Sequence, residues 1–250
     1  MRNKVLLACL AVAVLVAIAT NLPESRGNSN VAITPVVVEL FTSEGCSSCP
    51  PADKLLMKLQ QQHSLENAEL TLLGEHVDYW NGLGWKDRFS SAAFTERQRQ
   101  YVGAMRLSSA YTPQAVVDGH IDVLGSDEGA LERAVLRAAS TPKPAQVSLN
   151  HAEGDALEVK VANAENARVL LAITEDELTT QVDAGENGGR TLHHAAVVRE
   201  LRELAKTKDG RYAGEVKVSW RPEWKAGNLR VVVLAQLSNG QVVGAASVKR

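Results

Sequence analysis

The sequence has few cysteines, few aromatic residues and no excess of positive charge. Its 250 residues include three cysteines and 4% aromatic side chains, and 27 basic residues are set against 29 acidic ones. A nucleic-acid-binding protein needs a basic surface, so no nucleic acid is expected as a partner. Hydrophobic residues make up 45% of the chain and charged residues 22%, which is ordinary for a globular protein with a packed core.

A long apolar run, residues 5–19, lies at the N-terminus behind a short basic segment. Within it, Ala17 and Ala19 have the small-residue spacing that a signal peptidase accepts. We predict a cleaved signal peptide over 1–20 and a polar linker over 21–30, and hence an exported protein, periplasmic or secreted, with no stable membrane insertion. An uncleaved membrane anchor is the alternative, although the run is short of the ~20 residues that a bilayer core requires.

Cleavage also changes the charge and the cysteine count. It removes two of the 27 basic residues, so that the 29 acidic residues exceed the basic ones by four. It removes Cys9 as well, which leaves Cys46 and Cys49. In an oxidising compartment these two form the single intramolecular pair that the remaining chain allows.

The first half of the chain alternates between strand and helix patterns. A β-branched apolar run at 36–41 predicts a buried strand that leads directly into the two cysteines. An amphipathic helix opened by Pro50 follows, with Leu55 on its apolar side and Asp53 on its polar side. Further elements are expected in this order: a strand at 70–77, an aromatic-rich loop at 78–87, a helix at 91–105, a hairpin at 115–124 and a helix at 130–138.

Beyond residue 143 the pattern changes to short strands separated by Gly, Asn and Asp turns. Regularly spaced short strands favour an antiparallel sandwich. We therefore place a domain boundary here, with an α/β domain over 31–143 and an all-β sandwich-like domain over 144–250.

The sharpest chemical feature is the Cys46-Ser47-Ser48-Cys49 segment on a strand-to-helix turn. A helix N-terminus carries partial positive charge and free N–H groups, which stabilise a thiolate. We predict that Cys46 is the attacking thiol and that Cys49 resolves the mixed disulfide. Glu44 has the opposite effect, because a nearby carboxylate disfavours the thiolate.

A second feature is proline at the start of a later strand. Thioredoxin-type sites place a cis-proline opposite the dithiol, where it fixes the backbone that docks an extended substrate. Thr112 and Pro113 have the order and position for that role, and we predict them as substrate-docking residues. Glu44, His76, Asp78 and Trp80 are predicted to support the dithiol from nearby.

These segments resemble the DUF1223 family of exported, thioredoxin-like bacterial proteins of unknown function. The resemblance covers nearly the whole chain after the signal peptide and implies a thioredoxin-like fold and an envelope location. Together with the strand pattern, it gives the expected fold class: an α/β thioredoxin-like domain followed by an all-β sandwich-like C-terminal domain. Unlike thioredoxins proper, the sequence lacks a Trp before the first cysteine and a Gly-Pro spacer. The resemblance is carried by residues 37–53, 76–80, 84–87, 111–114 and 185–190.

The functional prediction is thiol–disulfide exchange with a protein or small-molecule thiol or disulfide, and no cofactor is expected. Two other readings of the cysteine pair are a structural disulfide and a copper or zinc site of Cys46, Cys49 and His76. A non-catalytic envelope binding module is a further alternative.

The patterns of three remaining segments are less specific, and each is interpreted more broadly. The aromatics of the loop at 78–87 form either a small satellite core or an apolar lip beside the dithiol. The glycine-rich segment 185–190 lacks the Lys-Ser/Thr of a phosphate-binding loop and is read as a β-turn. His193 and His194 are adjacent, so in a strand they point to opposite faces, and both are read as structural.

Overall fold

The structure is a computed structural model and describes residues 33–250. The predicted signal peptide and linker lie outside the described residues. The helices are α2 (Pro50–Gln62), α3 (Ala92–Ala104) and α4 (Glu128–Ala139), with a short 3₁₀ turn η1 (Ala226–Asn228). Within this described part, no helix has both the length and the apolar character needed to span a bilayer.

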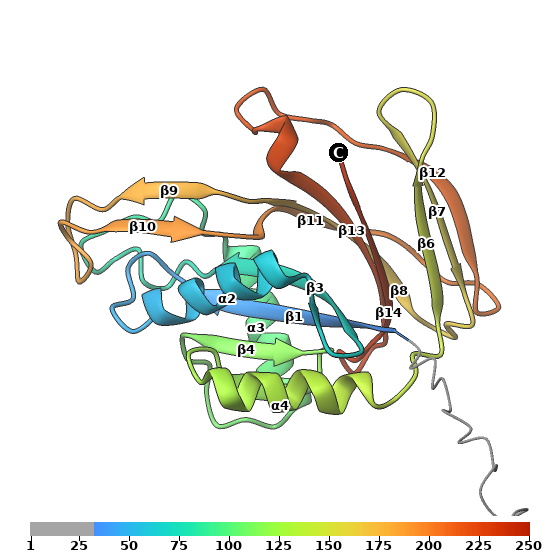
Figure 1. The fold of residues 1–250 in the computed structure, drawn as a ribbon, viewed down its shortest axis with the longest axis horizontal. Helices are drawn as coiled ribbons and strands as arrows, with labels where there is room; N and C mark the ends of the chain where they lie inside the picture. Colours follow the sequence, from blue (N-terminus) through green and yellow to red (C-terminus); the bar gives the residue numbers. More distant parts are fainter. Residues whose placement is uncertain (1–32) are drawn as a thin grey trace, which may run out of the picture. The chain divides into compact units, whose positions relative to one another are not determined.

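A nine-stranded mixed sheet forms the centre of the fold, in the order β14-β13-β8-β11-β3-β1-β4-β5, with β2 paired to β3 (Figure 1). Strands β1 and β3 are parallel, whereas β4 is antiparallel to β1. The strands of this sheet are β1 (Thr34–Thr42), β2 (Ser64–Leu65), β3 (Ala68–His76), β4 (Gln114–Val117), β5 (Ile121–Leu124), β8 (Arg168–Glu175), β11 (Val197–Lys206), β13 (Leu229–Gln236) and β14 (Val242–Lys249).

The two halves of the sequence meet between β3 and β11. The parallel pairing there has one register pair, Val197 with Gly74, and the Gly74 N–H donates to the Ala196 carbonyl at 2.7 Å. A Cβ on Gly74 would lie only 3.2 Å from the Ala195 carbonyl oxygen. Glycine therefore allows the backbones to approach closely at this joint.

Helices cover both faces of the N-terminal part of the sheet. The apolar stripes of α2 and α4 pack on one face, where Leu56 and Val135 contact the cluster around Val38. On the other face, Phe94 of α3 packs against residues such as Leu73. Each buried Leu, Val or Phe side chain stabilises the fold by about 1.5–3 kcal/mol relative to an exposed one, so these layers fix the position of the β1–α2 turn.

Helix α2 begins and ends as its sequence predicts. Pro50 and Pro51 occupy its first turn, where a missing N–H costs no hydrogen bond. The helix ends at His63, whose φ of 59° is left-handed and whose N–H donates to the Leu59 carbonyl. Cys49 is its N-cap residue.

A smaller three-stranded sheet, β12-β7-β6, packs on the C-terminal part of the large sheet. Leu157 and Val159 of the small sheet share a core with Leu171 and Val233 of the large one. The remaining pair of strands, β9 and β10, forms a separate hairpin. The bounds are β6 (Gln146–His151), β7 (Ala156–Ala162), β12 (Tyr212–Lys217), β9 (Leu178–Gln181) and β10 (Thr191–His194).

A buried polar cluster lies on the α3 face of the sheet. The Arg97 guanidinium donates to Glu39 at 2.5 Å and lies 3.3 Å from Glu75, while the Tyr101 hydroxyl donates to Glu39. Within residues 33–250, the carboxylate oxygens of Glu75 have no hydrogen-bond donor. Burial and the neighbouring Glu39 carboxylate raise the pKa of Glu75 well above its usual range.

The expected fold class, an α/β thioredoxin-like domain followed by an all-β sandwich-like domain, is wrong. The described chain is mostly β, and one mixed sheet takes strands from both halves of the sequence. The physical reason is the β3–β11 pairing, which continues the N-terminal sheet into β8, β13 and β14.

Candidate functional site

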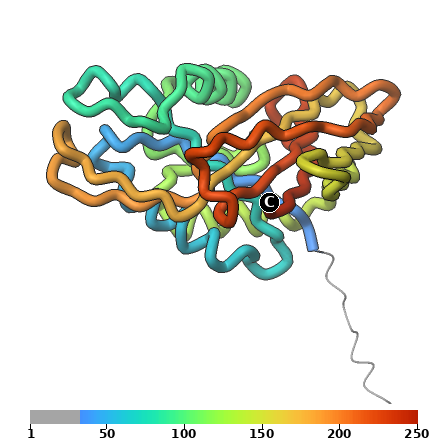
Figure 2. Tube along the Cα trace, turned by 90° about the horizontal axis from the view of Figure 1, so that it is seen from above, coloured from blue at the N-terminus to red at the C-terminus, as the bar shows by residue number. Residues whose placement is uncertain are grey.

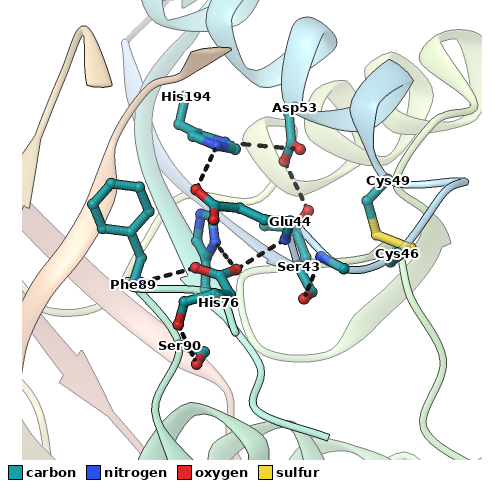
Figure 3. Close-up of polar contacts among 12 residues, drawn as sticks. Ser43, Glu44, Cys46, Cys49, Asp53, His76, Phe89, Ser90 and His194 are labelled. Carbon is teal, nitrogen blue, oxygen red and sulfur yellow. Dashed lines mark hydrogen bonds and ion pairs between the residues drawn. A yellow bond between two sulfur atoms is a disulfide. The ribbon is translucent and has the colours of Figure 1, made fainter. Parts of the chain in front are cut away.

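The cysteine pair lies between the end of β1 and the first turn of α2. Cys46 and Cys49 form a disulfide with their Cα atoms 5.4 Å apart (Figure 3). Both cysteines are fully buried, whereas Ser47 and Ser48 between them are exposed. The disulfide thus lies directly beneath a surface made by its own two-residue spacer.

The two sulfur atoms have different surroundings. The Thr112 hydroxyl donates to the Cys46 Sγ at 3.4 Å, and the Ser48 hydroxyl lies 3.3 Å from the same atom. No hydrogen bond reaches the Cys49 Sγ from the part of the chain that the structure describes. Hydroxyl groups are therefore available to stabilise negative charge on Cys46 alone.

Thr112 is itself held by the aromatic loop that follows β3. The Trp80 indole N–H donates to the Thr112 hydroxyl at 2.9 Å, and the Ser48 hydroxyl donates to the Thr112 carbonyl at 3.4 Å. The Thr112–Pro113 peptide bond is cis. The structure thus brings both predicted docking residues and Trp80 to the Cys46 side of the disulfide; whether they dock a substrate stays a prediction.

The hairpin β9–β10 contributes two residues from the other half of the sequence. The side-chain amide of Asn187, which is fully buried, donates to the carbonyls of Glu44 and Cys46, both at 2.9 Å. The exposed Glu186 carboxylate accepts from the Ser47 N–H at 3.1 Å. Figures 1 and 2 show this hairpin, in orange, beside the blue β1–α2 segment.

Behind the disulfide, on the α2 side of the sheet, lies a buried cluster of three carboxyl groups and two histidines (Figure 3). His76 Nδ1 lies 2.7 Å from the Asp87 carboxylate, and both residues are buried. Burial alone would lower the pKa of His76, but Asp87 outweighs this and raises it. Burial likewise opposes the charge on Asp87, yet His76 lowers its pKa. These two side chains form a buried hydrogen-bonded pair, which is an ion pair when His76 is protonated.

Glu44 points toward this cluster. Its carboxylate accepts from the Trp85 indole N–H at 2.8 Å and lies 3.4 Å from His194 Nε2, an ion-pair contact without well-aligned hydrogen-bond geometry. Burial would raise the pKa of Glu44, but His194 and Trp85 outweigh it and lower the pKa.

Asp53 completes the cluster from α2. Its Oδ1 accepts from the Thr42 hydroxyl at 2.8 Å, while its Oδ2 lies 3.8 Å from His194 Nδ1. Burial raises the pKa of Asp53, and the nearby His194 and His76 offset that only in part. The expectation that Asp53 belongs to the exposed side of its helix is wrong, because its side chain is 7% exposed.

The four residues predicted to support the dithiol have different partners in the structure. Glu44 and Trp80 lie near the cysteines, whereas His76 is paired with Asp87. Asp78 accepts from the Thr95 hydroxyl of α3 at 2.5 Å. Among residues 33–250 no group of three or more His, Cys, Asp or Glu side chains is arranged to hold a metal ion.

Sequence reasoning missed four contributors to this region: Asp53, Asp87, Glu186 and Asn187. It also missed the burial of His194, although strand alternation correctly separates it from the exposed His193. A signal existed for Asp53, which lies four residues after Cys49 and therefore on the same side of α2.

Comparisons with known proteins identify a family and a structural relative. The family model described as "Protein of unknown function (DUF1223)" matches residues 37–236. A crystal structure of a protein from Agrobacterium tumefaciens is 29% identical, with a TM-score of 0.67 over 85% of this chain and 93% of that chain. A second structure, of an endonuclease/exonuclease/phosphatase from Beutenbergia cavernae, matches 43% of this chain and 24% of its own. Its identity of 7% and TM-score of 0.21 are too low to indicate a shared fold. No curated protein matches the chain.

Proposed function

Because the chain belongs to the DUF1223 family, whose function is unknown, we propose its activity from the site: thiol–disulfide exchange at the Cys46–Cys49 pair. The observation that carries the proposal is the asymmetry of the two sulfurs. Hydroxyl groups of Ser48 and Thr112 contact the Cys46 Sγ, whereas the buried Cys49 is the N-cap residue of α2 and its sulfur has no such contact among residues 33–250. This is the arrangement expected of one attacking and one resolving thiol.

A purely structural role explains the pair less well. A disulfide stabilises a protein mainly by restricting the unfolded chain, and the effect grows with loop length. Sequence separation here is three residues, for which the loop-entropy relation gives about 2 kcal/mol, less than half of what a 100-residue loop gives. The disulfide therefore adds less stability than one that closes a long loop, and a structural role alone gives little reason for two buried cysteines at this turn.

The exchange begins when a substrate thiolate attacks the Cys46 Sγ. The Cys46–Cys49 bond breaks, Cys49 leaves with the electron pair, and Cys46 is joined to the substrate in a mixed disulfide. Because Cys46 is fully buried, the Ser48 and Thr112 hydroxyls must first turn aside. Substrate docking is proposed at Thr112 and Pro113, and the substrate is a protein or small-molecule thiol, or the disulfide in the reverse direction.

The proposed location is an exported, oxidising compartment, in which such a pair is maintained. The apolar run at residues 5–19 behind a basic segment supports this location. A blot of cell fractions, with the precursor and the cleaved chain resolved by size, tests it. A protein retained in the cytoplasm at precursor size contradicts it.

A redox titration of the purified protein tests the activity. Cys9→Ser is used as the background, so that trapping reagents report only Cys46 and Cys49. We expect a reversible two-electron couple that Cys46→Ser abolishes, and a Cys49→Ala variant that accumulates mixed disulfides with its substrates. If the pair is reduced only when the protein unfolds, the proposal is wrong.

A further inference from the structure

The buried position of Cys49 raises the question of where its proton goes. When the disulfide is reduced, Cys49 leaves as a thiolate, and its thiol must lose a proton again before it can attack. Cys49 is 0% exposed, so water does not reach it directly. A charged sulfur in such a place is costly, and an internal proton donor and acceptor is required.

Asp53 lies where that group is needed. Cys49 has helical backbone angles, and the Asp53 N–H donates to the Cys49 carbonyl at 3.1 Å. Residues four apart in a helix have Cβ atoms about 5–6 Å apart on one side. Within the described chain the Asp53 Oδ2 is buried and has no hydrogen-bond donor, so one of its carboxylate oxygens is free to exchange a proton.

His194 lies between Asp53 and Glu44, with its Nε2 3.4 Å from a Glu44 carboxylate oxygen. Its Nδ1 lies 3.8 Å from the Asp53 Oδ2, and neither of its ring nitrogens has a well-aligned hydrogen bond within residues 33–250. His194 also lines a hollow of about 200 Å³ between the end of α2 and β10, together with Met57, Gln60 and Ala195. This hollow opens at the C-terminal end of α2, whereas the cysteines lie at its N-terminal end.

We propose that Asp53 takes and returns the proton of Cys49, and that His194 exchanges this proton with Asp53. The inference rests on the proposed exchange activity. In the oxidising half-reaction, the Asp53 carboxylate takes the proton of the Cys49 thiol. The Cys49 thiolate then attacks the Cys46 sulfur of the mixed disulfide, the substrate leaves as a thiolate, and the proton passes from Asp53 to His194, whose other ring nitrogen faces the Glu44 carboxylate.

The other charged groups that face Asp53 are consistent with this role. Glu44 and Asp87 on the loops and His76 on β3 surround it, in addition to His194. His76 and Asp87 neutralise one another as a pair. The raised pKa of Asp53, caused by burial, brings this carboxyl closer to the pKa of a thiol, which favours proton transfer.

The experiment separates the two sulfur steps. Reduced protein in the Cys9→Ser background is mixed with the aromatic disulfide of thionitrobenzoate, which releases a coloured thiolate once when Cys46 attacks and again when Cys49 resolves. We expect Asp53→Asn to slow the second release by about 100-fold, the low end of general-base effects, and to leave the first unchanged. In wild-type protein the rate of the second release should rise with pH in the weakly acidic range, and in Asp53→Asn this rise should disappear.

Two further variants give the control and the second test. Asp118→Asn alters a fully buried carboxyl paired with Lys143 elsewhere in the sheet, and both releases should keep their rates. His194→Gln should slow the second release as Asp53→Asn does, and it decides the matter if Asp53→Asn fails to fold. Folding of each variant is checked by its unfolding midpoint.

The outcomes distinguish this inference from the proposed function. If wild-type protein gives no second release, exchange itself is refuted. If wild-type protein gives both releases and a folded Asp53→Asn variant keeps the rate and pH profile of the second, only the proton path is overturned. A slowing of the first release as large as that of the second also overturns it, because the effect would then be structural.

Discussion

Asn187 fixes the dithiol loop from a position about 140 residues later in the chain. Its buried amide donates to the carbonyls of Glu44 and Cys46 at 2.9 Å, and its own carbonyl accepts from Arg190 at 3.0 Å. Replacement by alanine removes the amide and leaves two buried carbonyl groups without these donors. The Asn187→Ala variant therefore measures how strongly the hairpin holds the loop.

The expected cost follows from the two hydrogen bonds. A buried acceptor left unpaired costs about 1–3 kcal/mol. The Cys46 carbonyl keeps the Cys49 N–H at 3.2 Å, so only the Glu44 carbonyl is left without a donor from the described chain, and we expect a loss of about 1–3 kcal/mol in the free energy of unfolding. The same loosening exposes the disulfide, so its reduction by a small dithiol should become faster.

Urea unfolding of the oxidised protein gives the first readout, and the rate of disulfide reduction gives the second. Asn150→Ala is the matched control, since Asn150 is an exposed asparagine of β6 and its loss should change the unfolding free energy by no more than about 0.5 kcal/mol. If Asn187→Ala and Asn150→Ala are equally stable and are reduced equally fast, the hairpin does not hold the loop and the reasoning is refuted.

Three further predictions concern charge. Glu186→Gln removes a carboxylate bound to the Ser47 N–H, so the pKa of the Cys46 thiol should fall, as measured by ultraviolet thiolate absorbance against pH; a rise contradicts this. Glu75→Gln should flatten the pH dependence of stability. Burial raises the pKa of Glu75 in the folded protein, so wild-type stability falls as pH rises from the ordinary glutamate pKa through the raised one. In urea unfolding, the variant should therefore gain stability relative to wild type at weakly alkaline pH but not at acidic pH. Arg97→Met leaves the buried Glu39 carboxyl group without its cation and should cost about 3–5 kcal/mol in urea unfolding; a cost below about 1 kcal/mol, within the range of exposed pairs, contradicts a buried ion pair here.

The local elements of the first half could be predicted because their causes are local. The apolar run at 36–41 lies within β1, and the helix opened by Pro50 is α2. Proline in the first turn and apolar residues at helical spacing act within a few residues of one another. The position of the cysteines at the start of α2 follows from the same short-range rules.

The arrangement of the sheet depends on pairings that local patterns do not specify. Strand periodicity indicates that residues 169–173, in the middle of β8, are buried. It does not indicate that β8 lies between β11 and β13. The junction at Gly74 and Val197 joins strands that are more than 120 residues apart in sequence. Without knowledge of that pairing, the strand-rich segment 144–250 is interpreted as a separate domain.

The candidate site was predictable only in part for the same reason. Cys46, Cys49 and Thr112 belong to segments with recognisable patterns. Asn187 and Glu186 lie in a glycine-rich loop whose sequence indicates only a turn, and nothing local shows what that turn contacts. His194 is one of two adjacent histidines, and its burial depends on the contact between the β9–β10 hairpin and α2.

The hairpin contact also has a consequence for the order in which the chain is made. Cys46 and Cys49 leave the ribosome long before Asn187, so during synthesis the pair exists without the residue that holds its loop. Any disulfide formed then closes a loop that is still free to move. The finished site, with its loop held by the Asn187 amide, arises only after residue 187 has emerged. A truncated chain that ends before residue 178 should therefore contain both cysteines but lack their native environment.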